Sequence, residues 1–305
     1  MESSGATPLV TRFAPAPTGF LHLGHIVNAI YVWGVARAGA PGRVVLRIED
    51  HDRFRSRLEF ESAILEDLEW LGFVPDGQPV RQRERNQLYD EALESLRRRG
   101  LTYACRCTRS QISADRVSGA QAFDPGRASD EPRYPGTCAR KGLTEGPGVG
   151  LRVRLEPSVE RFEDWRHGWQ EQRPDQQCGD MLVRDRDGNW TYQFAATVDD
   201  WLQHVTLVVR GDDLLASTGR QIQLARLLGR PTPPAFLHHP LVMKGATQKL
   251  SKSDGDTGIR DLRARGWSAA EVIGQAAALA HLIDAPRPLD VGAIAQLFAG
   301  LRPHI

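Results

Sequence analysis

The chain has 305 residues, of which 25% are charged and 41% hydrophobic, and its formal net charge is +1. A chain of this length can bury a full hydrophobic core, and its shares of charged and hydrophobic residues are ordinary for a globular protein. The small net charge excludes the bulk basicity of many nucleic-acid binders. Such contacts would need local patches, for which the arginine-rich segments 81–85 and 97–99 are candidates, or else they are solvated helix faces. No apolar run approaches the ~20 residues of a membrane span, and residues 1–6 lack the features of a signal peptide. We therefore expect a cytoplasmic protein without a membrane partner.

The first hundred residues alternate between apolar runs and helical periodicity. Residues 9–14 read as a buried strand, which ends at a Pro/Gly-rich turn before a helix from about 25 to 37. A second strand spans 43–49, and Ser56 is placed to cap a helix that continues through Trp70. A further helix, about 85–99, stops at Gly100. This order indicates a parallel sheet covered by helices.

The alternation breaks after residue 102 and later returns. Residues 103–150 show little periodicity, and 150–190 read as short strands, including 151–155. A strand at 205–210 and a helix near 221–228 restore the pattern, and one or two helices follow around 269–283. We expect one nucleotide-binding fold interrupted by an insertion. Its parts are a first half at 6–102, the insertion at 103–190, a second half at 191–255 and a short C-terminal helical segment at 256–305.

Two short segments carry the candidate nucleotide chemistry. His22, Gly24 and His25 lie where the first strand turns into the first helix. A helix N-terminus offers unpaired amides and a partial positive charge that suit phosphate, and Gly24 lets the nucleotide approach the backbone. Lys249 and Lys252 lie in a second segment, 249–253, and can bring mobile positive charge to the outer phosphates. Either segment alone can be chance or an exposed basic loop, but both in this order predict an ATP site.

This pair of segments resembles the pattern of class I aminoacyl-tRNA synthetases. Segments 12–19, 47–50, 198–200 and 210–213 further resemble the glutamyl-tRNA synthetase catalytic core, over about residues 9–255. The resemblance implies an α/β fold with a Rossmann-like parallel sheet, and activation of glutamate by ATP with Mg²⁺. The attacking carboxylate is already ionised, so positioning and electrostatic stabilisation carry the catalysis. We expect four residues to supply it: His22, His25, Lys249 and Lys252.

The charges of glutamate define the expected amino-acid pocket. Two carboxylates and one ammonium require two cations and one anion. Arg12 and Arg210 can each clamp a carboxylate, and Glu49 can pair with the ammonium. Which arginine holds which carboxylate stays open, and each can instead be a structural ion pair. Tyr192 would add a hydroxyl donor, and the remaining wall is expected from Phe13, Ala14, Pro15 and Ala16. Ala16 stands where these synthetases often have serine, which removes one polar contact.

A full glutamyl-tRNA synthetase carries a large anticodon-reading helical domain after the lysine segment, for which this chain has no room before residue 305. The chain therefore resembles the truncated paralogues, the glutamyl-queuosine tRNA(Asp) synthetase family. That resemblance implies a monomer that activates L-glutamate with ATP and transfers it to the queuosine base in the anticodon of tRNA(Asp). The alternatives are a nonstandard glutamyl-tRNA synthetase charging the 3′ end of tRNA(Glu), an inactive RNA-binding paralogue, and another small-molecule nucleotidyltransferase.

The cysteines predict a metal site within the insertion. Cys105, Cys107 and Cys138 can supply three corners of a tetrahedral zinc site, or they are free buried thiols. In the truncated family a Cys-x-Cys and a Tyr-x3-Cys supply four ligands, which adds Tyr134 as the fourth. Such a structural zinc would fix a loop-rich segment with few apolar residues. We expect Cys178 to be an inert thiol.

Overall fold

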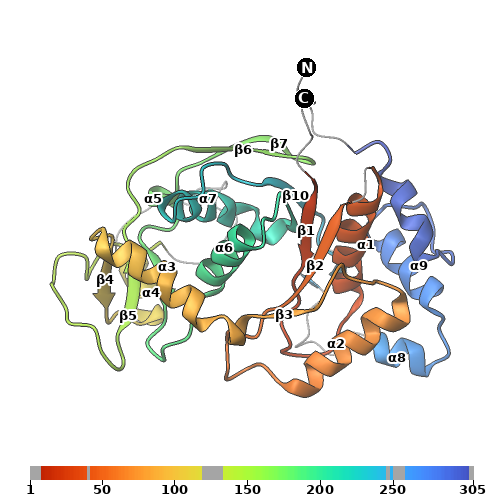
Figure 1. The fold of residues 1–305 in the computed structure, drawn as a ribbon, viewed down its shortest axis with the longest axis horizontal. Coiled ribbons are helices and arrows are strands. Elements are labelled where there is room, and N and C mark those ends of the chain that lie inside the picture. Colours follow the sequence, from red (N-terminus) through yellow and green to blue (C-terminus); the bar gives the residue numbers. More distant parts are fainter. Residues whose placement is uncertain (1–7, 40–41, 119–132, 245–247, 250–257, 302–305) are drawn as a thin grey trace.

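The computed structural model describes residues 8–39, 42–118, 133–244, 248–249 and 258–301. Its first half is built on a parallel three-stranded sheet in the order β1-β2-β3 (Figure 1). The strands are β1 (Val10–Phe13), β2 (Arg43–Ile48) and β3 (Val80–Arg81), and the helices of this half are α1 (Leu23–Arg37), α2 (Leu58–Leu71), the 3-10 turn η1 (Gln82–Glu84) and α3 (Asn86–Arg98). Val10 and Phe13 of β1 and the Val, Leu and Ile residues of β2 are buried, and α1 packs against this sheet.

The start of α2 differs from the sequence expectation. Arg57, not Ser56, is the N-cap residue, and no side chain caps this helix end. The backbone instead anchors the turn, since the Arg57 N–H donates to the Pro17 carbonyl at 3.0 Å. The expected cap at Ser56 was therefore wrong. The helix ends where Gly72 adopts φ +80°, a left-handed conformation that favours glycine.

The second half adds a four-stranded sheet in the order β7-β6-β10-β9, in which β6, β10 and β9 run parallel. Its strands are β6 (Glu160–Asp164), β7 (Gly168–Gln172), β9 (Leu207–Gly211) and β10 (Ala235–His239), and its helical segments are α6 (Tyr192–Leu202), η2 (Asp212–Ser217) and α7 (Thr218–Leu227). The two sheets meet between β1 and β9, where the Thr206 N–H donates to the Val10 carbonyl at 2.8 Å. The Rossmann-like fold is thus confirmed.

A separate antiparallel sheet, β4-β5-β8, lies at the end of the molecule away from α9 (Figure 1). It comprises β4 (Thr102–Cys105), β5 (Gly150–Val153) and β8 (Met181–Arg184), with α4 (Arg109–Ser118) and α5 (Pro174–Gln177) nearby in the chain. Neither β4 nor α4 was predicted from the sequence. Strands β6 and β7 fall within the expected insertion, yet they pair in the sheet of β9 and β10. The domain boundaries stay a prediction.

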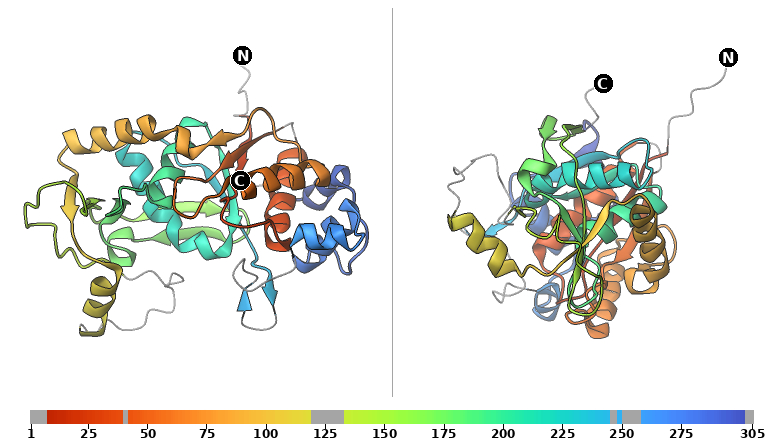
Figure 2. Two further views of the ribbon diagram at one scale, coloured as in Figure 1. Left: turned by 90° about the horizontal axis from the view of Figure 1, so that it is seen from below. Right: turned by 90° about the vertical axis from the view of Figure 1, so that its left-hand side faces the viewer.

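The C-terminal segment packs on the first half. Its elements are α8 (Ile259–Ala264), α9 (Ala269–Leu279) and the 3-10 segment η4 (Val291–Phe298). One core cluster joins α1, α9 and η4, so α1 lies between the sheet and the C-terminal helices (Figure 1). A two-stranded hairpin, β11 (Met243–Lys244) and β12 (Gln248–Lys249), projects from the body in the left view of Figure 2. None of the helices in the described ranges is long and apolar enough to cross a bilayer.

Candidate active site

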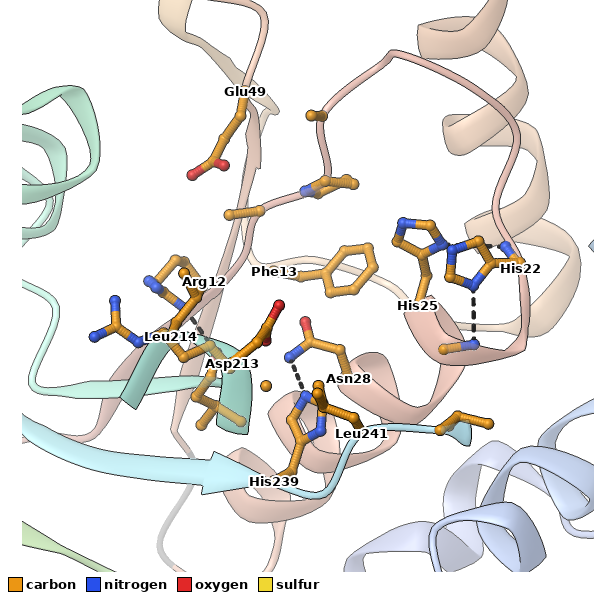
Figure 3. A pocket seen from close by; sticks show the side chains of 18 of the residues that line it. Arg12, Phe13, His22, His25, Asn28, Glu49, Asp213, Leu214, His239 and Leu241 are labelled. Atoms are coloured by element: carbon orange, nitrogen blue, oxygen red, sulfur yellow. Dashed lines mark hydrogen bonds between the residues drawn. The ribbon is translucent and has the colours of Figure 1, made fainter. Parts of the chain in front are cut away.

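A cavity of about 550 Å³ opens where β1 and β9 end, at the junction of the two sheets. The carboxyl ends of parallel strands are the usual ligand-binding edge of an open α/β sheet. Figure 3 shows Arg12 and Glu49 toward one end and His22 and His25 toward the other. The cavity is lined by all of the residues predicted to bind the amino acid and by three of those predicted to bind ATP. They are Arg12, Phe13, Ala14, Pro15, Ala16, His22, Gly24, His25, Glu49, Tyr192 and Arg210.

The two histidines form the N-terminal cap of α1. The Gly24 N–H donates to Nδ1 of His22 at 3.1 Å, and the His22 N–H donates to Nδ1 of His25 at 3.1 Å. Because each Nδ1 accepts a backbone proton, the neutral rings carry their own proton on Nε2. Both imidazoles are thereby fixed as hydrogen-bond donors through Nε2, which suits an anionic ligand.

Gly24 has a role that the sequence analysis did not foresee. A Cβ at this position would lie 2.9 Å from Cε1 of His22. The absence of a side chain therefore leaves room for the capping imidazole. The Gly24 amide already donates to that ring, so it is not one of the helix-start amides left for phosphate.

Arg12 is buried and already paired with a carboxylate. Its Nε donates to Oδ1 of Asp200 at 3.0 Å, and its Nη1 donates to the Val209 carbonyl at 2.9 Å. These two bonds use two of the five guanidinium donors. Arg12 is therefore fixed against α6 and β9 while its other donors remain for a ligand.

Arg47 lies between Asp200, which it shares with Arg12, and Glu49, the carboxylate that lines the cavity. Its side chain is fully buried and donates to Oδ1 of Asp200 at 2.7 Å and to Oε1 of Glu49 at 3.4 Å. Burial lowers the pKa of Arg47, but Asp200, Asp199 and Glu49 outweigh it and raise that pKa above its usual value. Burial raises the pKa of Asp200, but Arg12 and Arg47 outweigh it and leave that pKa below its usual value. The pair is thus ionised.

Asp199 extends this network to α3. Its carboxylate accepts from Gln82 at 2.8 Å, Arg85 at 2.6 Å and the Tyr89 hydroxyl at 2.8 Å. Arg47 and Asp199 lie in the motif segments 47–50 and 198–200, but no role was predicted for either residue from the sequence. The signal available was a charged residue inside an otherwise apolar strand, since Arg47 stands within Val-Val-Leu-Arg-Ile.

Glu49 and Tyr192 lie at the same end of the cavity. Burial raises the pKa of Glu49, although Arg47, His51 and Arg12 act against it. Burial disfavours the charged form of the Glu49 carboxylate, and the ammonium group of a bound amino acid would stabilise that charged form. Burial and the Glu49 charge raise the pKa of Tyr192, so its hydroxyl stays protonated and can donate.

Arg210 is held differently. Its Nη1 donates to Oε1 of Gln221 at 2.6 Å, its Nη2 to Oγ1 of Thr218 at 2.8 Å and its Nε to Nε2 of His238 at 3.0 Å. Arg210 and these three partners are all buried. In the described part of the chain, no carboxylate lies within 4.0 Å of this guanidinium.

Further lining residues escaped the sequence analysis at the opposite wall. Asn28 on α1 donates through Nδ2 to Nε2 of His239 at 2.9 Å, and Nδ1 of His239 lies 2.9 Å from the Pro240 carbonyl (Figure 3). Asp213 and Leu241 complete this wall. Helix periodicity marks Asn28 only as a polar residue in an apolar helix, which does not by itself identify a ligand site.

The lysine segment lies only partly within the described residues. Lys249 ends β12, and its backbone pairs with Met243. Lys252 lies outside the described residues. The roles predicted for both lysines stay predictions.

The predicted metal ligands lie together. The sulfurs of Cys105, Cys107 and Cys138 are all within 4.8 Å of one another. The Tyr134 hydroxyl lies 3.4 Å from the Cys105 sulfur and 4.0 Å from the Cys107 sulfur. Burial and the bond to Cys138 raise the pKa of Cys107 to about 11. Cys178 is not in this cluster, and its thiol donates to the Pro174 carbonyl at 3.2 Å.

A second, larger cavity of about 1000 Å³ connects these two regions. Its lining runs from Cys105, Cys107 and Tyr134 to Tyr192, which also lines the first cavity. Several cationic side chains contribute to its walls: Arg55, Arg109, Arg152, Arg186 and Arg220. Aspartates lie between them, so the wall is strongly polar and not uniformly basic.

Residues 8–274 match the family model described as "tRNA synthetases class I (E and Q), catalytic domain". The chain is 39% identical over 276 residues to a glutamyl-Q tRNA(Asp) synthetase of Rhodobacter capsulatus, which covers 87% of this chain and 98% of that protein. The chain belongs to the glutamyl-Q tRNA(Asp) synthetase family. A second member, from Symbiobacterium thermophilum, is 41% identical over 297 residues, covering 92% of this chain and 89% of the relative.

One relative is considerably longer than this chain. Glutamate–tRNA ligase 2 of Acidithiobacillus ferrooxidans is 39% identical over 95% of this chain, which spans 62% of that protein. Among solved structures, the glutamate-tRNA synthetase of Elizabethkingia anophelis aligns with a TM-score of 0.75 at 26% identity. That alignment covers 95% of this chain and 65% of the other. The fold of this chain is thus shared with part of that longer enzyme.

Proposed function

We propose that the chain activates L-glutamate with ATP and transfers it to the queuosine base in the anticodon of tRNA(Asp). The observation that carries this proposal is the single cavity of about 550 Å³, which brings the α1 histidine cap and the Arg12, Glu49 and Arg210 charges together. One end suits a triphosphate, and the other suits an amino acid with two carboxylates. The names of the family members agree with this reaction.

In the proposed activation step, the glutamate α-carboxylate attacks the α-phosphorus of ATP and pyrophosphate leaves. The carboxylate is already ionised, so the protein's contribution is to align the two substrates and stabilise the phosphate charge. His22 and His25 would donate through Nε2 to phosphate oxygens. Lys249 and Lys252 would add positive charge, and Mg²⁺ would enter with the nucleotide. Glu49 would bind the ammonium.

In the proposed transfer step, the RNA would enter through the second cavity. Tyr192 lines both cavities, so an acceptor base in the larger one would lie next to an adenylate in the smaller one. Arginines on the wall suit phosphate oxygens of an RNA segment, and the polar lining suits a hydroxylated base. The acceptor hydroxyl of queuosine would attack the glutamyl carbonyl, and AMP would leave with the acyl-phosphate oxygen.

We also propose that Cys105, Cys107, Cys138 and Tyr134 hold one structural Zn²⁺. The clustered sulfurs and the adjacent phenol fit a tetrahedral site, and a cation would keep the buried thiols deprotonated. The site would fix β4 and the segment around Tyr134, which forms the far wall of the second cavity. The monomeric state and the cytoplasmic location stay predictions.

One assay tests the proposed function. The protein is incubated with labelled glutamate, ATP, Mg²⁺ and tRNA(Asp) that contains or lacks queuosine, and the tRNA 3′ end is oxidised with periodate beforehand in half of the samples. Label that requires queuosine and survives oxidation supports the proposal. Label on tRNA(Glu) that oxidation abolishes would establish the 3′-end charging enzyme instead. No label and no glutamate-dependent pyrophosphate exchange would leave only an RNA-binding role.

A further inference from the structure

Three neighbouring strands end in a chain of buried polar side chains behind Arg210. Asp164 ends β6, His238 stands in β10 and Arg210 stands in β9, and these strands are adjacent in the order β6-β10-β9. In the parallel ladder, His238 is directly opposite Arg210. The side chains of Asp164 and His238 have no exposed surface, and Arg210 is 4% exposed while it lines the cavity.

The hydrogen bonds define the protonation of His238. Oδ2 of Asp164 lies 2.6 Å from Nδ1 of His238 and also accepts the His238 backbone N–H at 3.0 Å. A carboxylate at that distance places the ring proton on Nδ1. Nε2 then carries a lone pair, as it must, because the Nε of Arg210 donates to it at 3.0 Å. Burial lowers the pKa of His238 to about 4, although the hydrogen bond to Asp164 acts in the opposite direction. The ring is therefore neutral at pH 7.

Asp164 is itself fixed by the backbone. Its Oδ1 accepts the N–H groups of Arg166 at 3.0 Å and His167 at 2.9 Å. Burial raises the pKa of Asp164, but the hydrogen bonds from His238 and His167 outweigh it and leave that pKa below its usual value. The carboxylate is therefore ionised and immobile, and its position determines that of the imidazole.

The two cavity arginines consequently differ in charge balance. Arg12 donates directly to the Asp200 carboxylate at 3.0 Å. Arg210 donates to three neutral acceptors, and its further hydrogen-bonding neighbour, the Tyr192 hydroxyl, is protonated and also neutral. The N–H that remains on the guanidinium can donate to a carboxylate, and a buried cation with no ionised partner among the described residues attracts one strongly.

We propose that Asp164 and His238 are positioning residues, which orient Arg210 through a neutral acceptor so that its full charge remains for a carboxylate of the substrate. This inference rests on the proposed function, since it assigns the occupant of the site as an amino acid with two carboxylates. A direct carboxylate partner at position 238 would hold Arg210 equally well but neutralise it. The imidazole is held in place by Asp164 and in turn orients Arg210, while the Asp164 carboxylate makes no direct contact that would neutralise the guanidinium.

Two substitutions of His238 separate positioning from packing. In His238→Gln the amide oxygen can occupy the place of Nε2 and accept from Arg210. In His238→Asn the shorter amide can reach Asp164 but not Arg210. Both remove an imidazole and introduce a buried amide, so each is a control for the other. The readout is glutamate-dependent ATP–pyrophosphate exchange, with KM for glutamate, KM for ATP and kcat measured separately.

We expect His238→Asn to raise KM for glutamate about 10- to 100-fold, which corresponds to a misplaced charge-assisted hydrogen bond. KM for ATP and kcat should change less than about threefold, and His238→Gln should stay within about threefold of the wild type in all three constants. Equal increases for both variants, or changes confined to kcat or to KM for ATP, would overturn the positioning role. Absence of exchange in the wild-type protein would instead refute the proposed function.

A measurement on the wild-type protein covers the case in which His238→Asn does not fold. A ¹⁵N–¹H correlation spectrum of protein labelled in its histidine rings at pH 7 should contain a neutral ring protonated on Nδ1 that disappears in His238→Gln. A ring at this position that is protonated on Nε2, or on both nitrogens, would overturn the proposal, because it could not accept from Arg210.

Discussion

The buried imidazole of His238 should make the folded protein sensitive to mild acid. The ring has no exposed surface, and its pKa is lowered from 6.5 to about 4 because burial outweighs the bond to Asp164. In the unfolded chain the ring takes up a proton near pH 6.5. The unfolded state therefore binds more protons than the native state between pH 6.5 and about 4. Stability is retained above this range and is lost as the pH falls through it.

The size of the effect follows from these two values. At pH 5 almost every unfolded chain carries this proton and almost no folded chain does. Moving from pH 7 to pH 5 then removes about 2 kcal/mol of unfolding free energy through this one group. For a chain of this length, that corresponds to a fall in Tm of about 4 °C.

The measurement compares the wild type with His238→Gln by urea unfolding and by thermal melting at pH 7 and pH 5. Glutamine does not titrate, so the variant should lose about 2 kcal/mol less between the two pH values, whatever its stability at pH 7. The exposed His204→Gln serves as a control for removing a surface histidine. If wild type and His238→Gln lose the same free energy between pH 7 and pH 5, the imidazole is not held neutral.

Three further predictions concern the ion network, the metal and the lysine segment. Arg47→Met should lower the unfolding free energy by about 3–5 kcal/mol, because it leaves buried carboxylates without their shared cation; a loss below about 1 kcal/mol in urea titrations would contradict this. A strong chelator should lower the Tm of the wild type and of Cys178→Ser alike, whereas Cys138→Ser should have a lower Tm that the chelator no longer changes; metal analysis that finds no zinc in the purified wild type would remove the proposed site. Lys252→Ala should slow glutamate-dependent pyrophosphate exchange at least about 10-fold with an unchanged Tm, and an unchanged rate would exclude that lysine from activation.

The sequence predicted those features that local pattern determines. The apolar run at 43–49 gives β2, and the Pro/Gly-rich turn after the strand at 9–14 gives the start of α1, because buried strands and their turns have a local composition. The motif segments also singled out Arg12, His22 and Arg210, and the fold brings them to one cavity. Their chemical roles stay predictions.

The features that escaped prediction depend on contacts between distant residues. Strand β4 has little periodicity of its own and is defined by pairing with β5, where Thr102 lies opposite Val153. His238 and Asp164 are 74 residues apart, and in sequence each reads as an ordinary polar residue. Buried polar side chains have no local signature, since only the fold shows whether a carboxylate faces water or an imidazole. Ser56 illustrates the converse, because a suitable cap residue stood one position too early.

The ion network between the two halves has a consequence for synthesis of the protein. Arg12 and Arg47 are separated from Asp200 by 188 and 153 residues. A ribosome adding roughly 5–20 residues per second therefore exposes the first half for many seconds before Asp200, the carboxylate that both arginines share, has been made. Burying both arginines without that carboxylate is costly, so we expect the nascent first half to stay open until Asp200 is available. The amino-acid end of the cavity therefore forms only when both halves have emerged, since it needs Arg12 and Glu49 from the first and Arg210 from the second.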